Sequence, residues 1–375
     1  MNINHCASTM QIMSPLAHNR AIGTLTHPPT TTMANTNAPA GSVGPAPFRD
    51  VCGEMPPPAP SSEGPDDADA EAASASPAAT RRLCCYQGTW VPKLCLPGVL
   101  AIQRGFTPRP GDVVLANPHK CGTTWLKALA FATMARGVHP PTPEHLEHPL
   151  LRLNPHDCVP FMDMLFATGS GSKMDALPSP RLMATHMHHA LLPASISENP
   201  QCKIVYICIG RDPKDMVVSL WHFVRKMIPD LSFSDMFEHA CEGVSYSGPI
   251  WDHVLGYWNA SKASPKTVLF LRYEDMLRNP VDNTRKLARF VGQPFSPAEE
   301  EGGVAMDIVR LCSFEKMKNL EVNKSDGSSG PLFTNNMYFR KGAVGDWTNH
   351  MTPEMARRLD TIVEEKLRGS GLSFV

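Results

Sequence analysis

The sequence predicts an α/β fold in which a central parallel β-sheet is flanked by helices. Short runs rich in Val, Ile and Leu alternate with longer stretches of helical character through most of the chain. Strands that alternate with helices favour parallel pairing, with the connecting helices packed on both faces of the sheet. Ligands of such sheets bind beyond the carboxyl ends of the strands, so we expect the chemistry in the loops that follow them.

Individual elements follow from the same pattern. The last helix is the best delimited, because Thr352 is a typical N-cap, Pro353 fits the first helical position and Gly369 follows the last turn. Its apolar residues share one face, which predicts core packing. We expect strands at 112–116, 181–185, 203–208 and 267–271, and earlier helices at 124–136, 213–226 and 280–291.

Residues 1–80 differ from the rest of the chain. They are rich in Pro, Ala, Ser, Thr and Gly and carry almost no aromatic side chains. Such a segment cannot bury enough apolar surface to offset its chain entropy, so we expect a disordered extension followed by one folded domain over 81–375. No acidic residue precedes Asp50, as in organelle transit peptides, but arginine is scarce there too, and Met33 offers a second start. The composition favours the plain extension, and the transit peptide stays open.

Composition excludes several classes of protein. Apolar residues make up 42% of the 375 residues and the net charge is -1, so the core is sizeable and no global basic field favours nucleic acid as a partner. The best apolar run, 126–135, is too short to span a bilayer. The 11 cysteines form no Cys-x-x-Cys pair, and no signal peptide is apparent. We therefore expect a cytoplasmic protein with free, mostly buried thiols.

The loop after the strand at 112–116 has the features of an anion site. Lys120 supplies positive charge, Gly122 permits a tight turn, and Thr123 and Thr124 add hydroxyls where the next helix begins. The amides of that first helical turn and the helix dipole attract anions. Cys121 stands where a Walker A loop has its magnesium-binding Ser or Thr, which indicates phosphate binding without the metal. By itself, a Thr-capped helix beside a surface lysine explains the segment equally well.

The run from Lys120 through Leu129 resembles the 5′-phosphosulfate loop of the cytosolic sulfotransferases, particularly their plant members. That family has a P-loop-like fold and uses 3′-phosphoadenosine 5′-phosphosulfate (PAPS) as its donor. Further motifs resemble the family in the same chain order, which chance would rarely produce. The resemblance implies donor contacts by Lys120, Cys121, Gly122, Thr123, Thr124, Trp125, Arg211, Ser219, Tyr273, Cys312, Phe314, Arg340, Lys341 and Gly342.

These later motifs have distinct roles in the family. Arg211 and Ser219 resemble the residues that contact the donor's 3′-phosphate, which a planar guanidinium can grip with two hydrogen bonds. The Arg340-Lys341-Gly342 segment resembles the signature that closes over the same phosphate. The tyrosine that approaches the adenine corresponds to Tyr273, and the phenylalanine that stacks on the base corresponds to Phe314. For either aromatic residue alone, core packing would be the better prediction.

Sulfuryl transfer to a hydroxyl needs a base for its proton and positive charge for the leaving phosphate oxygen. His186 follows the strand at 181–185 and resembles the catalytic base of the family's Thr-His motif. The resemblance implies that Lys120 stabilises the departing oxygen and that Ser219 restrains this lysine until the acceptor binds. His186 and His188 could instead bind a metal, but no carboxylate or thiol lies nearby in the sequence, so we expect none.

Several positions depart from the family pattern. Pro118 and His119 stand where the family has an aromatic residue and proline, and Cys312 replaces the usual threonine. Two extra residues, 209–210, precede Arg211 and would weaken donor binding if they moved it away. His188-His189 replace a common Pro-aromatic pair. The dimer motif of animal relatives is absent around 348–354, so homodimerisation has no support in the sequence.

The sequence therefore predicts an enzyme, a PAPS-dependent sulfotransferase acting on a hydroxyl of a small apolar acceptor. By the resemblance, that acceptor is a flavonoid, steroid, hydroxyjasmonate or similar compound of plant secondary metabolism. Two alternatives stay open: a protein that binds the donor or its product without catalysis, and a magnesium-dependent P-loop kinase. We expect neither nucleic acid nor a membrane as a partner. Neither the acceptor's identity nor the oligomeric state follows from the sequence.

Overall fold

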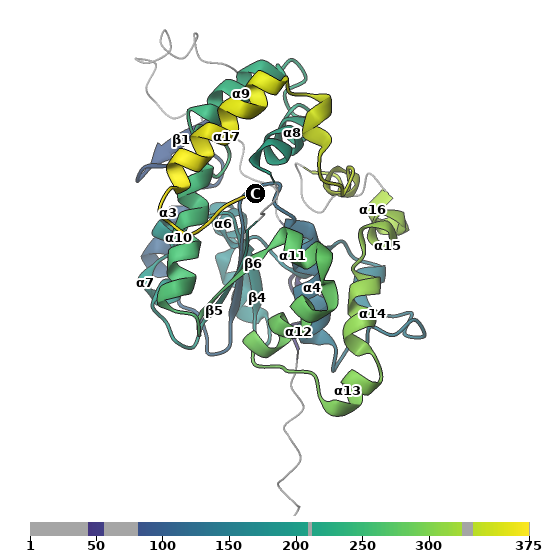
Figure 1. Ribbon diagram of the computed structural model, residues 1–375. Helices are drawn as coiled ribbons and strands as arrows, with labels where there is room; N and C mark the ends of the chain where they lie inside the picture. The colour runs from purple at the N-terminus through teal and green to yellow at the C-terminus, as the bar shows by residue number, and fades with distance from the viewer. Residues whose placement is uncertain (1–43, 56–81, 209–211, 325–332, 375) are drawn as a thin grey trace, which may run out of the picture. The chain divides into compact units, whose positions relative to one another are not determined.

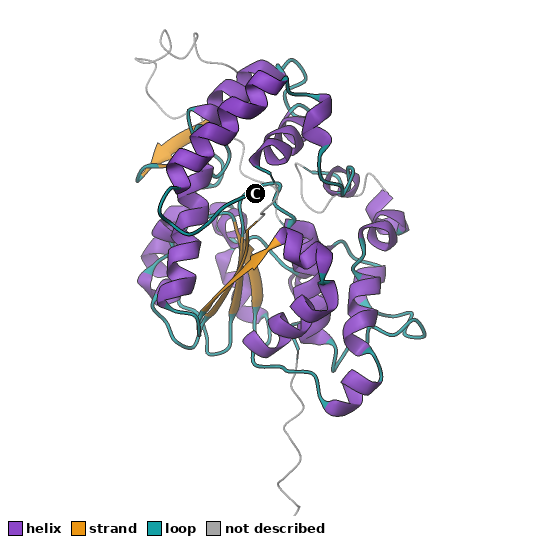
Figure 2. Cartoon of the chain, viewed as in Figure 1, coloured by secondary structure: helices purple, strands orange, loops and turns teal. Residues whose placement is uncertain are grey.

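Four parallel strands form the centre of the fold in the computed structural model, which describes residues 44–55, 82–208, 212–324 and 333–374 (Figures 1 and 2). They lie in the order β4-β3-β5-β6. All four expected strands are confirmed to within one residue, as β3 (Val113–Ala116), β4 (Leu182–Thr185), β5 (Lys203–Cys208) and β6 (Val268–Arg272).

The register of the sheet brings the strand exits together. Ala116, the last residue of β3, lies opposite Thr185 of β4 and Tyr206 of β5. Because the strands are parallel, the loops that follow them leave from the same edge. A separate antiparallel hairpin, β1 (Leu83–Tyr86) with β2 (Thr89–Pro92), was not anticipated from the sequence.

The helices expected from the sequence are also present. The α-helices are α1 (Phe48–Cys52), α3 (Leu96–Gly105), α4 (Thr123–Ala135), α5 (Pro155–Cys158), α6 (Met162–Ala167), α7 (Ala194–Ser197), α8 (Pro213–Val224), α9 (Phe233–Cys241), α10 (Ile250–Ala263), α11 (Tyr273–Arg278), α12 (Pro280–Phe290), α13 (Pro297–Glu301), α14 (Val304–Leu311), α15 (Phe314–Asn319), α16 (Glu321–Lys324) and α17 (Pro353–Leu367). Short 3₁₀ helices are η3 (Pro149–Leu151), η4 (Gly171–Ala176), η5 (His189–Leu191), η6 (Asn335–Tyr338) and η7 (Asp346–Asn349).

The two faces of the sheet build two apolar cores. Side chains alternate between faces along a strand, so Val114 and Ala116 of β3 enter one core while Val113 and Leu115 enter the other. Figure 1 shows α4, α12 and α14 on one side of the sheet and α3, α6 and α10 on the other. Both faces are covered, as the near-continuous apolar strands predict.

Side-chain caps fix the starts of α8 and α17, and the cap of α17 was predicted. The Asp212 carboxylate accepts a hydrogen bond from the Lys214 amide at the start of α8. The Thr352 hydroxyl accepts one from the Met355 amide at the start of α17, whose apolar face is buried. A side-chain acceptor at this position stabilises a helix by about 1 kcal/mol.

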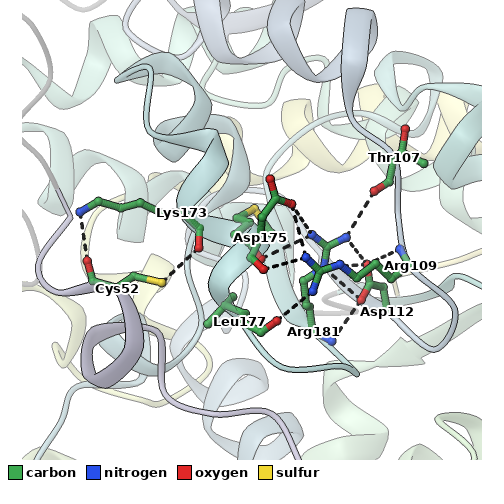
Figure 3. Close-up of polar contacts among 9 residues, drawn as sticks. Cys52, Thr107, Arg109, Asp112, Lys173, Asp175, Leu177 and Arg181 are labelled. Atoms are coloured by element: carbon green, nitrogen blue, oxygen red, sulfur yellow. Dashed lines mark hydrogen bonds and ion pairs between the residues drawn. The ribbon is translucent and has the colours of Figure 1, made fainter.

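Residues 44–55 contradict the expectation that all of 1–80 is disordered. They contain α1, and the ring of Phe48 is only 1% exposed within a core. The Cys52 thiol donates to the Lys173 carbonyl, with 3.2 Å between sulfur and oxygen (Figure 3). One buried aromatic ring and a few polar contacts therefore anchor this short segment. The average composition of the N-terminal region conceals it.

A buried ion pair ties the starts of β3 and β4 together. Asp112 and Arg181 immediately precede these strands and are 0% and 2% exposed. The Arg181 guanidinium donates to the Asp112 carboxylate from Nε, 3.0 Å from Oδ2, and its backbone amide donates to Oδ1 (Figure 3). Arg109 joins the group by donating to the Leu177 carbonyl. Several hydrogen bonds on one carboxylate compensate for the desolvation of both charges.

Two expectations drawn from composition can be compared with the described residues. Among their helices, none has the length and apolar character needed to cross a membrane. Their cysteines form no disulfide, and most of them are buried, as predicted.

Candidate active site

The loop after β3, named here the cradle, makes the tight turn predicted from Gly122. Lys120 and Gly122 both adopt left-handed backbone conformations, with φ of 61° and 76°, which turn the chain sharply into α4. Glycine takes this conformation without strain, whereas lysine does not, and strained residues cluster at functional sites. The Lys120 ammonium lies 4.3 Å from the centre of the Phe223 ring. Asn117, beneath the loop, donates from its amide to the Thr123 hydroxyl.

His186 follows β4 and lies against this loop. Its Nδ1 is 2.7 Å from the Asn117 carbonyl oxygen. A carbonyl can only accept, so Nδ1 carries the proton and Nε2 keeps its lone pair. The His186 backbone amide donates to Oδ2 of Asp163 at 3.3 Å. Burial lowers the pKa of the imidazole to about 3, so the ring is neutral at neutral pH. This is the protonation state that a general base requires.

His119 is a site residue that sequence reasoning noted only as a departure from the family. Its ring stacks on His186 with 3.8 Å between centroids, and its Nδ1 is 2.6 Å from the Ser247 hydroxyl. A small cavity, partly open to solvent, lies beside the two imidazoles. It is lined by Trp90, Val91, Pro92, Cys95, Val99, His119, Asp163, His186, Met187, His188, Leu191 and Ser247.

A second layer of hydrogen bonds holds the His186 backbone. The His186 carbonyl accepts from Nε2 of His253 at 3.2 Å, so Nδ1 of His253 accepts from the Tyr206 hydroxyl at 3.0 Å. His188 is turned elsewhere, because its Nε2 donates to the Ser247 carbonyl. Among the described residues, His186 and His188 belong to no cluster of metal-type ligands.

A buried lysine supports the cradle from below. Lys127 on α4 is fully buried, and its ammonium nitrogen is 2.8 Å from the Val159 carbonyl oxygen, 3.1 Å from Nδ1 of His156 and 3.3 Å from the centre of the Phe161 ring. Desolvation holds the pKa of this lysine well below its usual value. Burial also raises the pKa of the nearby Asp163 carboxyl to about 6. The sequence offered Lys127 only as one residue of a helix.

Helix α8 links the cradle to the C-terminal motif. It carries the buried Ser219 and, one turn later, Phe223, which lies under the Lys120 ammonium. Near its start, the Asp215 carboxylate accepts hydrogen bonds from the amides of Gly345 and Trp347, at 2.6 and 3.0 Å. Arg211, predicted to grip the 3′-phosphate, lies outside the described residues.

The predicted phosphate clamp is held by one carboxylate. Arg340 and Lys341 both form ion pairs with Asp346. Although burial raises its pKa, the hydrogen bonds from Lys341 and Arg340 hold the Asp346 carboxyl below its ordinary value. Gly342 has φ of 65°, and a β-carbon placed there would lie 2.6 Å from the Phe314 ring. The clamp and the predicted base-stacking ring are therefore in contact.

The remaining predicted residues divide into two groups. Tyr273 packs against the cradle, with its ring edge-on to Trp125 at 5.6 Å and 3.3 Å from a β-carbon placed at Gly122. Cys312, in contrast, is 1% exposed and points into the core behind α4. Burial raises the pKa of its thiol far above the usual range. Tyr273 thus contacts the cradle, whereas the Cys312 side chain is part of the apolar core.

The sequence over residues 110–371 matches the family model described as "Sulfotransferase domain". The chain belongs to the sulfotransferase family. It is similar to cytosolic sulfotransferase 5 of Arabidopsis thaliana, with 43% identity over 300 residues that cover 78% of this chain and 91% of the relative. It is also similar to flavonol 3-sulfotransferase of Flaveria bidentis, with 42% identity over 295 residues that cover 76% and 91%.

A solved structure supports the fold of this sulfotransferase. A mouse sulfotransferase complexed with PAP is similar at 27% identity and a TM-score of 0.59, over 77% of this chain and 95% of the mouse chain. The predicted P-loop-like α/β sulfotransferase fold and the predicted enzyme class, a PAPS-dependent sulfotransferase, are confirmed at the level of the family.

Proposed function

We propose that this sulfotransferase moves a sulfuryl group from PAPS to the hydroxyl of a small apolar acceptor, with His186 as the base. The observation that carries the proposal is the tautomer of His186. Its Nδ1 proton is committed to the Asn117 carbonyl, so the lone pair of Nε2 is left to take a proton beside the cavity. The cradle that begins at Lys120 is adjacent to His186, because His119, the residue before Lys120, stacks on the His186 ring.

The proposed reaction requires no metal ion. The acceptor's hydroxyl proton passes to Nε2 of His186 while its oxygen forms a bond to sulfur. The bond between sulfur and the bridging phosphate oxygen breaks, and the electron pair leaves with that oxygen. The Lys120 ammonium stabilises the negative charge that develops there, and Ser219 on α8 positions this lysine. Alignment and fixed positive charge supply most of the rate enhancement in transfers of this kind.

The donor site is proposed to extend from the cradle to the clamp. The amides of residues 121–125 would hold the 5′ end, and Arg340 and Lys341, with Arg211, would hold the 3′-phosphate. Tyr273 and Phe314 would border the adenine. The PAP bound by the mouse relative supports this choice, since PAP, the adenosine bisphosphate, is what remains of PAPS after transfer. Both cations of the clamp already face a carboxylate, which a phosphate could replace.

The acceptor is proposed to enter the cavity beside His186. Its walls combine apolar side chains such as Trp90, Val99 and Leu191 with the polar groups of His119 and Ser247. Flat apolar ligands with a single reacting hydroxyl suit such a lining. The similarity to a flavonol sulfotransferase supports a phenolic acceptor, and the cytosolic relative supports a cytoplasmic location.

The test compares His186→Ala with His189→Ala, a matched control three residues away whose ring packs on Tyr257. Transfer from PAPS to a panel of flavonols and steroids is followed by mass spectrometry, and PAP binding by calorimetry. We expect His186→Ala to bind PAP as the unmodified protein does and to lose transfer by 10² to 10⁴-fold, the usual contribution of a general base. Retained transfer by His186→Ala would exclude the role of this histidine.

The same measurements separate the alternatives. Tight PAP binding by the unmodified protein without transfer to any acceptor would favour a binding protein over an enzyme. Loss of activity on addition of a chelator would favour the magnesium-dependent kinase. Our proposal expects transfer at saturating PAPS to persist when a chelator is added, because no metal takes part in the proposed transfer step.

A further inference from the structure

Three metal-type ligands converge beside the phosphate clamp. His222 lies on α8, whereas Asp346 and His350 lie four residues apart at η7. The Nε2 atoms of His222 and His350 are 3.4 Å apart, and Oδ2 of Asp346 is 3.9 Å from Nε2 of His350. All three ligand atoms lie within 4.8 Å of one another, and no other such cluster occurs among the described residues.

The distance between the two imidazole nitrogens equals that expected for two ligands of one metal ion. Two nitrogens bound tetrahedrally to Zn²⁺ at 2.0–2.1 Å are separated by about 3.4 Å. The His222 and His350 Nε2 atoms already have this separation. Asp346 would complete three ligands after moving by roughly 1 Å, which leaves a fourth position open. Two imidazoles and one carboxylate suit zinc better than magnesium or calcium, which prefer oxygen ligands.

We propose that His222, Asp346 and His350 form a binding site for a divalent transition-metal ion of the zinc class. The site is partly accessible, since the His350 side chain is 23% exposed, while Asp346 is 2% exposed. Trp221, Phe233 and the other aromatic rings around His350 surround it with apolar surface. This arrangement of a buried carboxylate and partly exposed imidazoles provides both a protected anion and a path for entry.

Metal binding would change the partners of the clamp. The Asp346 carboxylate is held by Arg340 and Lys341, and a divalent ion on Oδ2 would compete with the Arg340 guanidinium for the same oxygen. The released guanidinium would then be available to an anion. Zinc should therefore strengthen PAP binding, a consequence that rests on the proposed function.

The test uses the full chain with zinc alone, and a phosphine reductant keeps its thiols reduced. Because several cysteines can also bind zinc, the measured quantity is the difference between variants in the number of zinc ions bound per chain. Calorimetry and equilibrium dialysis compare the unmodified protein with His350→Phe and His222→Gln. His145→Phe, a substitution on the loop before η3, is the control. Thermal unfolding without metal establishes which variants are folded. One folded site variant is sufficient for the comparison of zinc binding.

We expect the unmodified protein and His145→Phe to bind one more zinc ion per chain than either site variant. Equal binding by all four proteins would overturn the metal site. With cobalt in place of zinc, the unmodified protein should show the visible absorption typical of cobalt bound by nitrogen and oxygen ligands. Both site variants should lack this absorption, and its persistence in them would also overturn the proposal.

The consequence for PAP is measured separately. We expect zinc to raise the PAP affinity of the unmodified protein about fivefold or more, and to leave that of His350→Phe unchanged. An unchanged affinity in the unmodified protein would refute the coupling but leave the metal site supported by the zinc data. Absence of PAP binding with or without zinc would refute the proposed donor site instead.

Discussion

Gly342 offers a direct test of the phosphate clamp. Its φ of 65° strains any other residue, and a β-carbon would lie 2.6 Å from the Phe314 ring, where ordinary contact begins at 3.4 Å. In Gly342→Ala the ring or the clamp must therefore move by roughly 0.8 Å, and displacements of about 1 Å in a positioned site can cost 10²-fold in function. The left-handed strain itself costs about 1–2 kcal/mol.

A matched glycine separates strain from displacement. Gly345 in the same segment has φ of 87°, but a β-carbon there would meet no atom within 4 Å. Calorimetry with PAP and thermal unfolding are compared for Gly342→Ala and Gly345→Ala. We expect similar losses of stability but a PAP affinity at least tenfold lower for Gly342→Ala, or about 1.4 kcal/mol of binding free energy. Equal PAP affinity in the two variants would show that the contact with Phe314 does not position the clamp.

Two further predictions concern buried charges. A base must be unprotonated, and a pKa of about 3 keeps His186 unprotonated well into the acid range. The fall of kcat/KM at acidic pH should therefore reflect protonation of the Asp163 carboxylate, whose pKa is about 6. The pH profile of Asp163→Asn should lack that fall, and its persistence would assign it to another group. Asp112→Ala leaves the 2% exposed Arg181 guanidinium with only the exposed Asp175 carboxylate, 3.6 Å away, as an ion-pair partner, and should lower the free energy of unfolding by about 3–5 kcal/mol in urea titrations. Asp275→Ala, which breaks an exposed pair, is its control and should change stability little; a similar loss in both would refute the argument.

The sheet was predictable because each of its strands is apolar on both faces and bounded by turn residues. The strand at 203–208 and the helix after Asp212 are correct to within about two residues, because a cap and a proline fix the boundary locally. The hairpin at 83–92 carries no such signal, since its strands are short and half-exposed. Phe48 was missed for a related reason: burial of a single ring depends on tertiary contacts and not on local composition.

The candidate site shows the same division between local and tertiary information. Lys120 and His186 were found because each follows a strand, and parallel strands end at one edge of the sheet. Nothing local indicates Ser247, which reaches His119 from 128 residues away. Nor could the sequence show that Cys312 points into the core, because helical periodicity does not distinguish a core thiol from one that faces a ligand.

His119 illustrates how a departure from a family motif can become part of the site. The loop geometry survives the displaced proline, because Lys120 and Gly122 supply the two left-handed residues that turn the chain. The imidazole at 119 then fills the space between Ser247 and His186 by stacking on the proposed base at 3.8 Å. Desolvation, followed by the neighbouring His186, lowers the pKa of His119 well below its usual value. Desolvation keeps His186 neutral as well, so the substitution at position 119 places a second neutral imidazole against the proposed base.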